Sequence, residues 1–396
     1  MYKIIAIVFS AILVNNSLQS QITLGNGNLS DYLNTVTTAV PFLRITPDAR
    51  SAGMGDVGIA TTPDVNSIYW NTSKLGFIND DHPSAVSVNY VHFQSGLNSN
   101  PFLASVYGYQ KLNDKNVVTL SARYFSLGKV ALTGTGTLND FHTREFAFDV
   151  GCARKVFENI SVGLNLKYLY TNIPEAYAAS GVQIKPAQGI ASDISLFNSN
   201  KFEIFNKDSE LGIGINVSNI GNKIIYTSSI EKDYLPTNLA IGTSYQVNLN
   251  EFNKLSFAID LNKLMVPTPD TSDIEPQNGI PDFREQTVLS GIFNSFSDAP
   301  DGFTEEIHEV TISTGLEYWF DNKLAIRTGY FYEHATKGGR QFYTVGGGIH
   351  YNTFGLDFAY LLPSQGNQNP LDPVARISLN LNLHELHKTK HDDGNS

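Results

Sequence analysis

This chain of 396 residues has a single cysteine, and it lacks long apolar runs and an excess of basic charge. Its one cysteine, Cys152, has no partner, so no disulfide framework can stabilise the fold. After Val14, no segment approaches the roughly 18 consecutive apolar residues that a membrane-spanning helix needs. A formal net charge of -11 excludes the basic footprint that nucleic-acid binding requires.

The N-terminus has the layout of a secretory signal. Lys3 precedes a mostly apolar run at residues 4–14, and polar residues follow up to Ser20 and Gln21. The run is too short to span a membrane as a helix. We therefore predict a signal peptide at residues 1–20 and an exported mature chain.

Strict alternation of polar and apolar residues is the strongest pattern that is present. Residues 376–383 alternate without a break, and about a dozen similar segments precede them. Successive side chains of a strand point to opposite faces, and many alternating runs of about 10 residues are typical of outer-membrane barrels. The fold class predicted is all-β, a 14-stranded antiparallel transmembrane β-barrel over residues 83–384. The expected strands are 84–93, 102–112, 116–127, 143–156, 159–171, 188–198, 209–219, 236–247, 254–263, 308–320, 322–334, 340–351, 353–362 and 373–384.

The connections alternate between short and long. We expect the short ones, together with a longer one at residues 199–208, to lie in the periplasm. An even number of strands then returns both termini to the periplasm, which predicts an integral protein of the bacterial outer membrane surrounded by lipid. Two aromatic girdles are also expected. The outer one contains Tyr168, Tyr170, Tyr330, Tyr332 and Tyr360, and the inner one contains Tyr318, Phe320, Tyr351 and Phe354.

The faces opposite the apolar ones carry charges of both signs, which we place in the lumen. Hairpin geometry brings Glu317 nearly opposite Arg327, and Asp357 and Arg376 lie on neighbouring strands. An arginine or lysine on the lipid face near the midplane would cost about 2–4 kcal/mol. These lumen ion pairs are either a structural ladder or part of a selective conduction path.

A segment before the first strand, residues 21–82, is rich in Gly, Ala, Thr and Pro and lacks sustained alternation, so we predict a hatch or plug. Within it, Gly53-Met54-Gly55-Asp56-Val57-Gly58 has the spacing of a dinucleotide-binding loop. That chemistry requires a preceding buried strand, whereas Pro47 and Asp48 stand just before this motif. The glycines therefore favour tight backbone packing.

The hatch also carries a family resemblance. Residues 42–56, 58–64 and 69–75 resemble the PorV family, outer-membrane proteins of the type IX secretion system of Bacteroidetes, which belong with the FadL-like fatty-acid transporters. The resemblance implies a 14-stranded barrel with an N-terminal hatch. One departure is that the family's Asn-Pro-Ala appears here as Asn71-Thr72-Ser73. The candidate hatch residues are Arg50, Gly53, Gly55, Asp56, Trp70, Asn71 and Leu75.

By this resemblance the chain is expected to be a carrier. PorV-like proteins bind the large translocon barrel SprA, receive secreted cargo through its C-terminal domain, and deliver it to the attachment complex that contains PorU. The alternative is a FadL-like channel for uptake of long-chain fatty acids or other hydrophobic compounds. That alternative predicts an apolar pocket between hatch and wall, and a lumen lined only by polar side chains would argue against it.

A long connection at residues 264–307, expected outside the cell, is strongly acidic and has Arg284 as its single base. Long connections without obvious structure are usually functional or disordered. An apolar cluster within it either covers the barrel mouth or meets a partner or cargo. Its members are Val288, Leu289, Ile292, Phe293, Phe296 and Phe303.

Motifs for catalysis and metal binding are absent. The sequence has no Gly-x-Ser-x-Gly elbow, no His-Glu-x-x-His helix, no cysteine pair and no EF-hand spacing. We therefore expect no enzyme activity, no cofactor and no metal. The histidines near the end belong to a solvated periplasmic tail, residues 385–396.

Overall fold

The computed structural model describes residues 35–93, 100–131, 140–172, 185–226, 232–269, 282–364 and 373–383. The predicted signal peptide and the predicted C-terminal tail lie outside the described residues. Fourteen antiparallel strands form a closed barrel in which β1 (Ser84–Phe93) pairs with β16 (Pro373–Asn382), so the predicted fold class is confirmed.

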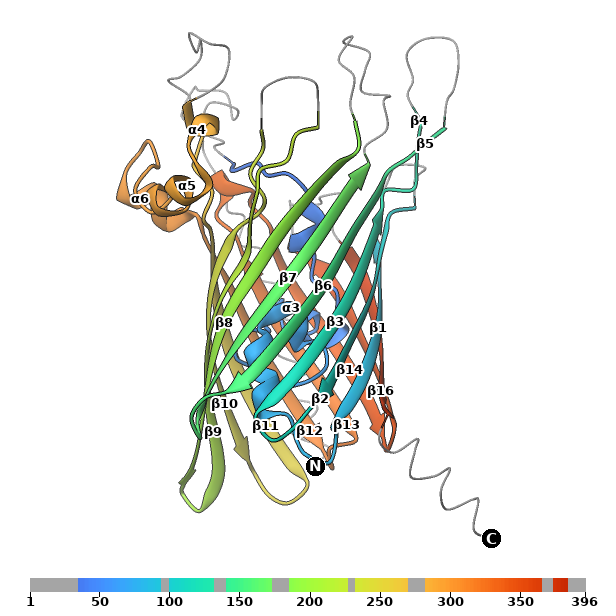
Figure 1. Ribbon diagram of the computed structural model, residues 1–396. Helices are drawn as coiled ribbons and strands as arrows, with labels where there is room; N and C mark the ends of the chain where they lie inside the picture. Colours follow the sequence, from blue (N-terminus) through green and yellow to red (C-terminus); the bar gives the residue numbers. More distant parts are fainter. Residues whose placement is uncertain are drawn as a thin grey trace. The chain divides into compact units, whose positions relative to one another are not determined.

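The other barrel strands follow one another as a meander (Figure 1). Strand β3 neighbours β6 because β4 (Lys129–Ala131) and β5 (Asp140–His142) form a separate two-stranded sheet. The remaining strands are β2 (Phe102–Lys111), β3 (Asn116–Ser126), β6 (Arg144–Lys155), β7 (Ile160–Asn172), β8 (Ala187–Ile204), β9 (Lys207–Gly221), β10 (Asn238–Asn248), β11 (Asn253–Leu264), β12 (Val310–Phe320), β13 (Leu324–Tyr332), β14 (Gln341–Tyr351) and β15 (Phe354–Pro363).

The two ends of the barrel differ. At one end, here called the short-turn end, tight turns join β2 to β3, β6 to β7, β8 to β9, β10 to β11, β12 to β13 and β14 to β15. At the other, the helical end, the connection between β11 and β12 carries α4 (Asp282–Glu285), α5 (Val288–Asn294) and α6 (Phe303–His308), and η5 (Ala335–Lys337) follows β13. Helices α5 and α6 project sideways from this end beyond the barrel wall (Figure 1).

One expected connection is wrong. Residues 199–208 are not a longer loop, because β8 and β9 continue as a paired ladder until Ile204 faces Lys207. Phe205 and Asn206 make a two-residue turn with φ of 50° and 58°, as type I′ hairpins require. Buried and exposed positions no longer alternate at residues 201–204, because both faces of this protruding hairpin are exposed.

The outward faces of the strands are apolar and exposed. Leu166 is 59% and Ile326 is 69% exposed, and each alternates with buried inward-facing neighbours. An apolar exterior of this kind suits contact with hydrocarbon. Several charged residues of the strands lie on the buried inner side, namely Asp149, Lys167, Asp260, Glu317 and Arg327. No helix among the described residues is long and apolar enough to cross a membrane.

Residues 35–83, here called the hatch segment, lie inside the bore (Figure 1). The segment contains η2 (Pro41–Arg44), α2 (Ala49–Ala52), α3 (Ser67–Trp70) and η3 (Thr72–Phe77). Near the helical end the Ala39 N–H donates to the Tyr234 carbonyl (2.8 Å), and near the short-turn end Ser161 Oγ donates to the Ser73 carbonyl. The segment therefore runs along much of the bore.

Candidate functional site

A buried ion network joins the hatch segment to the barrel wall. Arg50 follows the N-cap Asp48 in α2, and its guanidinium donates to both oxygens of Glu317 on β12 (2.9 and 2.7 Å). Arg327 on β13 donates to the same carboxylate (2.7 Å) and to Asp357 on β15 (2.7 Å). Glu317 lies directly opposite Arg327 in the strand register and is 1% exposed.

Arg376 does not pair with Asp357, although their strands are neighbours. Its Nε donates to the Thr46 carbonyl (3.1 Å), and its Nη2 lies 3.6 Å from Asp56 Oδ1. Arg376 therefore holds the hatch segment, and Asp357 is shared by Arg327, His350 and Asn380. Arg50 also pairs with Asp64 (2.8 Å). Sequence reasoning missed Asp64 because its partner is known only once the segment is folded.

The glycine motif of the hatch segment packs backbone against backbone. A Cβ on Gly53 would lie 3.1 Å from the Cα of Gly346, and one on Gly55, whose φ is 74°, would lie 2.6 Å from the amide of Tyr330. On the facing wall, a Cβ on Gly329 would come within 2.1 Å of the Met54 carbonyl carbon. Small residues on both sides therefore allow close approach, and no preceding strand or following helix forms a nucleotide site here.

The remaining candidate hatch residues hold the segment together and attach it to the barrel wall. Trp70 Nε1 donates to Asp48 (2.8 Å), and Asn71 Nδ2 bridges the carbonyls of Ile59 and Leu196 (3.0 and 3.1 Å). Leu75 is fully buried in an apolar cluster with barrel residues. Asp260 on β11 accepts the amides of Gly58 and Ile59 (2.7 and 2.9 Å), a contact that the glycine motif alone did not reveal.

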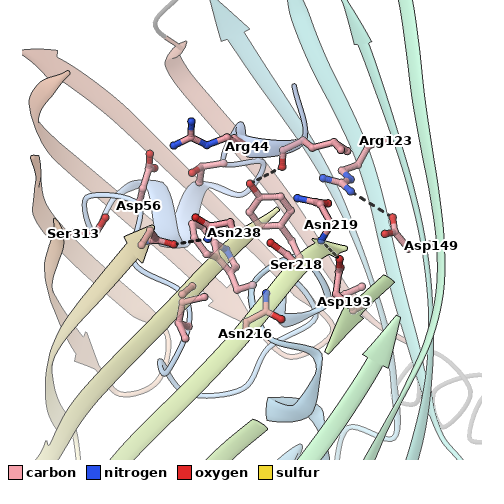
Figure 2. A pocket seen from close by; sticks show the side chains of 18 of the residues that line it. Arg44, Asp56, Arg123, Asp149, Asp193, Asn216, Ser218, Asn219, Asn238 and Ser313 are labelled. Atoms are coloured by element: carbon pink, nitrogen blue, oxygen red, sulfur yellow. Dashed lines mark hydrogen bonds and ion pairs between the residues drawn. The ribbon is translucent and has the colours of Figure 1, made fainter. Parts of the chain in front are cut away.

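A cavity of about 100 Å³ lies between the hatch segment and the wall (Figure 2). Most of its lining is polar. On one side Lys167 bridges Asp149 (3.5 Å) and Asp193 (3.2 Å), and Arg123 lies 3.6 Å from Asp149. On the other side the lining from β9 to β12 is mainly neutral amides and hydroxyls. This lining offers little to a hydrocarbon ligand.

The acidic connection at the helical end has more structure than its sequence suggested, because three short helices form. Helix α5 is capped by Thr287, whose Oγ1 accepts the Ser290 amide (3.2 Å). Glu309, beside α6, accepts from Lys263 on β11 (2.5 Å) and from Lys337 (3.0 Å), and Lys263 also binds Glu306 (2.9 Å). These ion pairs fix α6 to the rim of the barrel.

The helices expose apolar side chains to solvent. Phe293 is 73% and Phe303 is 79% exposed, and Val288 and Ile292 are half-buried. The five exposed side chains form what we call the outer apolar surface, namely Leu289, Phe293, Phe296, Phe303 and Ile307. Of the predicted cluster, four members therefore remain uncovered in the chain by itself.

The apolar exterior, closed barrel and inward-packed segment define the chain as a β-barrel of the outer-membrane class. The chain belongs to the PorV family, because the family model described as "Type IX secretion system protein PorV" matches residues 28–271. It is thus an outer-membrane component of the type IX secretion system, as the sequence resemblance predicted.

Solved structures with a similar fold have low sequence identity. The toluene transporter TodX of Pseudomonas putida is 12% identical (TM-score 0.48; 83% of this chain and 95% of that chain covered). The Ralstonia pickettii toluene transporter TbuX is 13% identical (TM-score 0.49; 86% and 99%). A Pseudomonas aeruginosa FadL homologue is 12% identical (TM-score 0.45; 89% and 100%). No curated protein sequence matches the chain significantly.

Proposed function

We propose that this protein binds the SprA translocon barrel and the C-terminal domain of secreted cargo, and carries that cargo to the surface attachment complex that contains PorU. In this proposal the helical end faces the cell exterior, and both termini and the short turns face the periplasm. The observation that carries the proposal is the outer apolar surface.

Large apolar side chains that stay in water are unfavourable unless a partner covers them. Full burial of a phenylalanine or leucine side chain contributes about 1.5–3 kcal/mol, so several of them supply the core of a specific interface. The ion pairs of Lys263 and Lys337 hold α6 in place before binding, and Lys223 and Tyr234 donate to the Gln286 carbonyl just before α5, which lowers the ordering cost of association. A rigid apolar projection at the rim suits docking against another protein.

The runner-up, uptake of hydrophobic compounds through the bore, is less well supported. The cavity beside the hatch segment is lined mainly by polar groups, and the segment itself is fixed to the wall by charged hydrogen bonds. A hydrocarbon in that cavity would leave buried polar groups without partners, at about 1–3 kcal/mol each.

The test is a pull-down from native membranes with the affinity-tagged chain carrying Leu289→Glu and Phe293→Glu together. We expect loss of SprA and cargo from the eluate and loss of cargo from the cell surface. Phe205→Glu is the matched control, because Phe205 is 93% exposed at the short-turn end. Unchanged partner recovery with the double variant, or normal cargo display in a deletion strain, contradicts the proposal.

A further inference from the structure

A second cavity, of about 490 Å³, lies at the helical end between the start of the hatch segment and the barrel wall, and we call it the mouth cavity. The charged residues of its lining are four bases and two acids, namely Arg44, Lys337, Arg340, Arg376, Asp56 and Glu333. The mouth cavity is therefore basic in a chain whose net charge is -11, and this local excess of positive charge favours an anionic ligand.

Three of the four bases already have an acidic partner. The pairs are Arg340 with Glu333 (2.9 Å), Arg376 with Asp56 (3.6 Å) and Lys337 with Glu309 (3.0 Å). Both acids of the lining are thus engaged by a base other than Arg44. The charge of Arg44 is the one that the lining leaves uncompensated.

Arg44 ends the short helix η2 and is half-buried. Its neighbours Phe42 and Leu43 pack into an apolar cluster with wall residues, and its own guanidinium makes no ion pair or hydrogen bond within the described residues. Figure 2 labels Arg44 and shows no interaction between it and the other side chains drawn. Burial and the like charge of Arg340 lower the pKa of Arg44 to about 10, so the guanidinium stays charged at neutral pH.

One unpaired guanidinium matches one carboxylate. The planar fork of an arginine can donate two parallel hydrogen bonds to a carboxylate, and the two single charges cancel. A phosphate dianion would bring a second negative charge, for which the three paired bases offer no uncompensated partner. Apolar side chains complete the lining, so the ligand should carry an apolar group beside its carboxylate. They are Val36, Ile45, Phe93, Phe342 and Leu361.

The start of the hatch segment suits a ligand with a peptide backbone. Residues 35–38 line the mouth cavity, have neither helix nor turn, and make no backbone hydrogen bond within the described residues. Backbone N–H and C=O groups without an internal partner can pair with a second extended chain. A chain that enters from the helical end reaches Arg44 with its terminus first, because the hatch segment occupies the bore on the other side (Figure 1).

We propose that the mouth cavity binds the C-terminal carboxylate of an extended peptide whose last side chain is apolar. Arg44 pairs with the carboxylate, and residues 35–38 bind the backbone behind it. A volume of about 490 Å³ lies within the range of about 300–1,000 Å³ that is usual for ligand sites. The inference does not depend on docking at the outer apolar surface, which is a separate part of the helical end.

The test uses the full chain purified in detergent and the pentapeptide Ala-Thr-Val-Thr-Leu, labelled at its N-terminus, in a fluorescence anisotropy titration. We expect saturable binding of the free acid and, for the C-terminal amide, binding weaker by about tenfold or more. Arg44→Met should weaken binding of the acid to the level of the amide. Arg154→Met is the matched control, because Arg154 is an exposed arginine near the short-turn end and should leave binding unchanged.

Competition separates the possible sources of the anion. Neither hexanoate nor inorganic phosphate should displace the peptide at equal concentration, and displacement by either one would assign the mouth cavity to small anions and overturn the proposal. It is also overturned by equal binding of acid and amide, by no saturable binding, or by unchanged affinity in Arg44→Met.

The acid and amide comparison needs no substitution, so it decides the question even if Arg44→Met fails to fold, which heat-modified migration in electrophoresis would reveal. Recovery of SprA in the pull-down should be unaffected by Arg44→Met, so failure of this inference can be distinguished from failure of the proposed function.

Discussion

Replacing Arg50 with methionine should loosen the hatch segment from the barrel wall. Methionine keeps much of the length of the side chain but removes both hydrogen bonds to Glu317, the ion pair with Asp64 and the two contacts with Thr62. Removal of one partner from a buried ion pair costs about 3–5 kcal/mol. Glu317 keeps Arg327 at 2.7 Å, so we expect the lower end of that range.

About 3 kcal/mol corresponds to roughly a hundredfold increase in the open population of the segment. Hydrogen exchange measured by mass spectrometry on residues 48–64 should therefore become much faster. The barrel ladder should keep its protection, because its backbone hydrogen bonds do not depend on Arg50. Lys323→Met is the control, since Lys323 and its partner Asp321 (2.6 Å) lie at an exposed turn and should not affect the hatch segment.

A double-mutant cycle makes this prediction sharper. The double variant Arg50→Met/Glu317→Gln should cost less than the sum of the two single variants, because each single change already disrupts the hydrogen bonds between Arg50 and Glu317 and the sum counts that loss twice. Additive effects of the two changes, or wild-type exchange rates in Arg50→Met, would refute the view that this network holds the segment in place.

Three further changes test other parts of the structure. Gly329→Ala places a methyl group against Met54 and should destabilise hatch packing by about 1–3 kcal/mol, measured as faster proteolysis of the segment. Leu166→Arg, on the outward face of β7, should lower barrel stability in lipid vesicles by about 2–4 kcal/mol, measured by urea unfolding. Burial raises the pKa of Asp298 to about 6, so its contribution to stability is complete at low pH and lost as the pH rises through 6. Hydrogen exchange at residues 282–309, corrected for intrinsic rates, should be slower at pH 5 than at pH 7.5, and Asp298→Asn should remove that difference while keeping an acceptor for the Thr268 amide.

Each of these three predictions has a control or an outcome that would contradict it. Gly347→Ala should be tolerated, because the one neighbour of its added methyl group is a carbonyl oxygen at an ordinary 3.5 Å, and equal damage at both glycines would contradict the packing argument. Leu112→Arg, near the short-turn end, should cost much less than Leu166→Arg, and equal costs would argue against hydrocarbon at mid-height. A persistent pH dependence in Asp298→Asn would assign the titration to another group.

Strands could be predicted from the sequence because one physical rule governs all of them. Each strand must present apolar residues outward and polar residues inward, so a period of two is imposed residue by residue. This requirement applies only to residues within the barrel wall. The prediction missed the end of the β8–β9 hairpin, where residues 201–204 still alternate in sequence but are exposed on both faces, and it missed the small sheet of β4 and β5.

Helices at the helical end were missed for a different reason. Leu289, Phe293 and Phe296 stand at helical spacing, i, i+4 and i+7, which the sequence analysis treated only as an apolar cluster. The pairing of charges in the bore was predictable only within a hairpin, as for Glu317 and Arg327. The partners of Arg50 and Arg376 depend on how the hatch segment folds across the bore, and no local pattern encodes that.

Transport through the bore would require breaking strong contacts, whereas binding at the rim would not, and this difference favours a carrier over a channel. Hydrogen bonds to charged groups contribute about 1.5–3 kcal/mol each, so the two from Arg50 to Glu317 and the two from the Gly58 and Ile59 amides to Asp260 hold the hatch segment by roughly 6–12 kcal/mol. A passage through the bore would have to break them in every transport cycle. The outer apolar surface is already formed and uncovered, so binding there breaks no such contact. We therefore expect partner exchange at the rim to proceed with the hatch segment in place, and a disulfide that fixes this segment to the wall should leave cargo delivery intact.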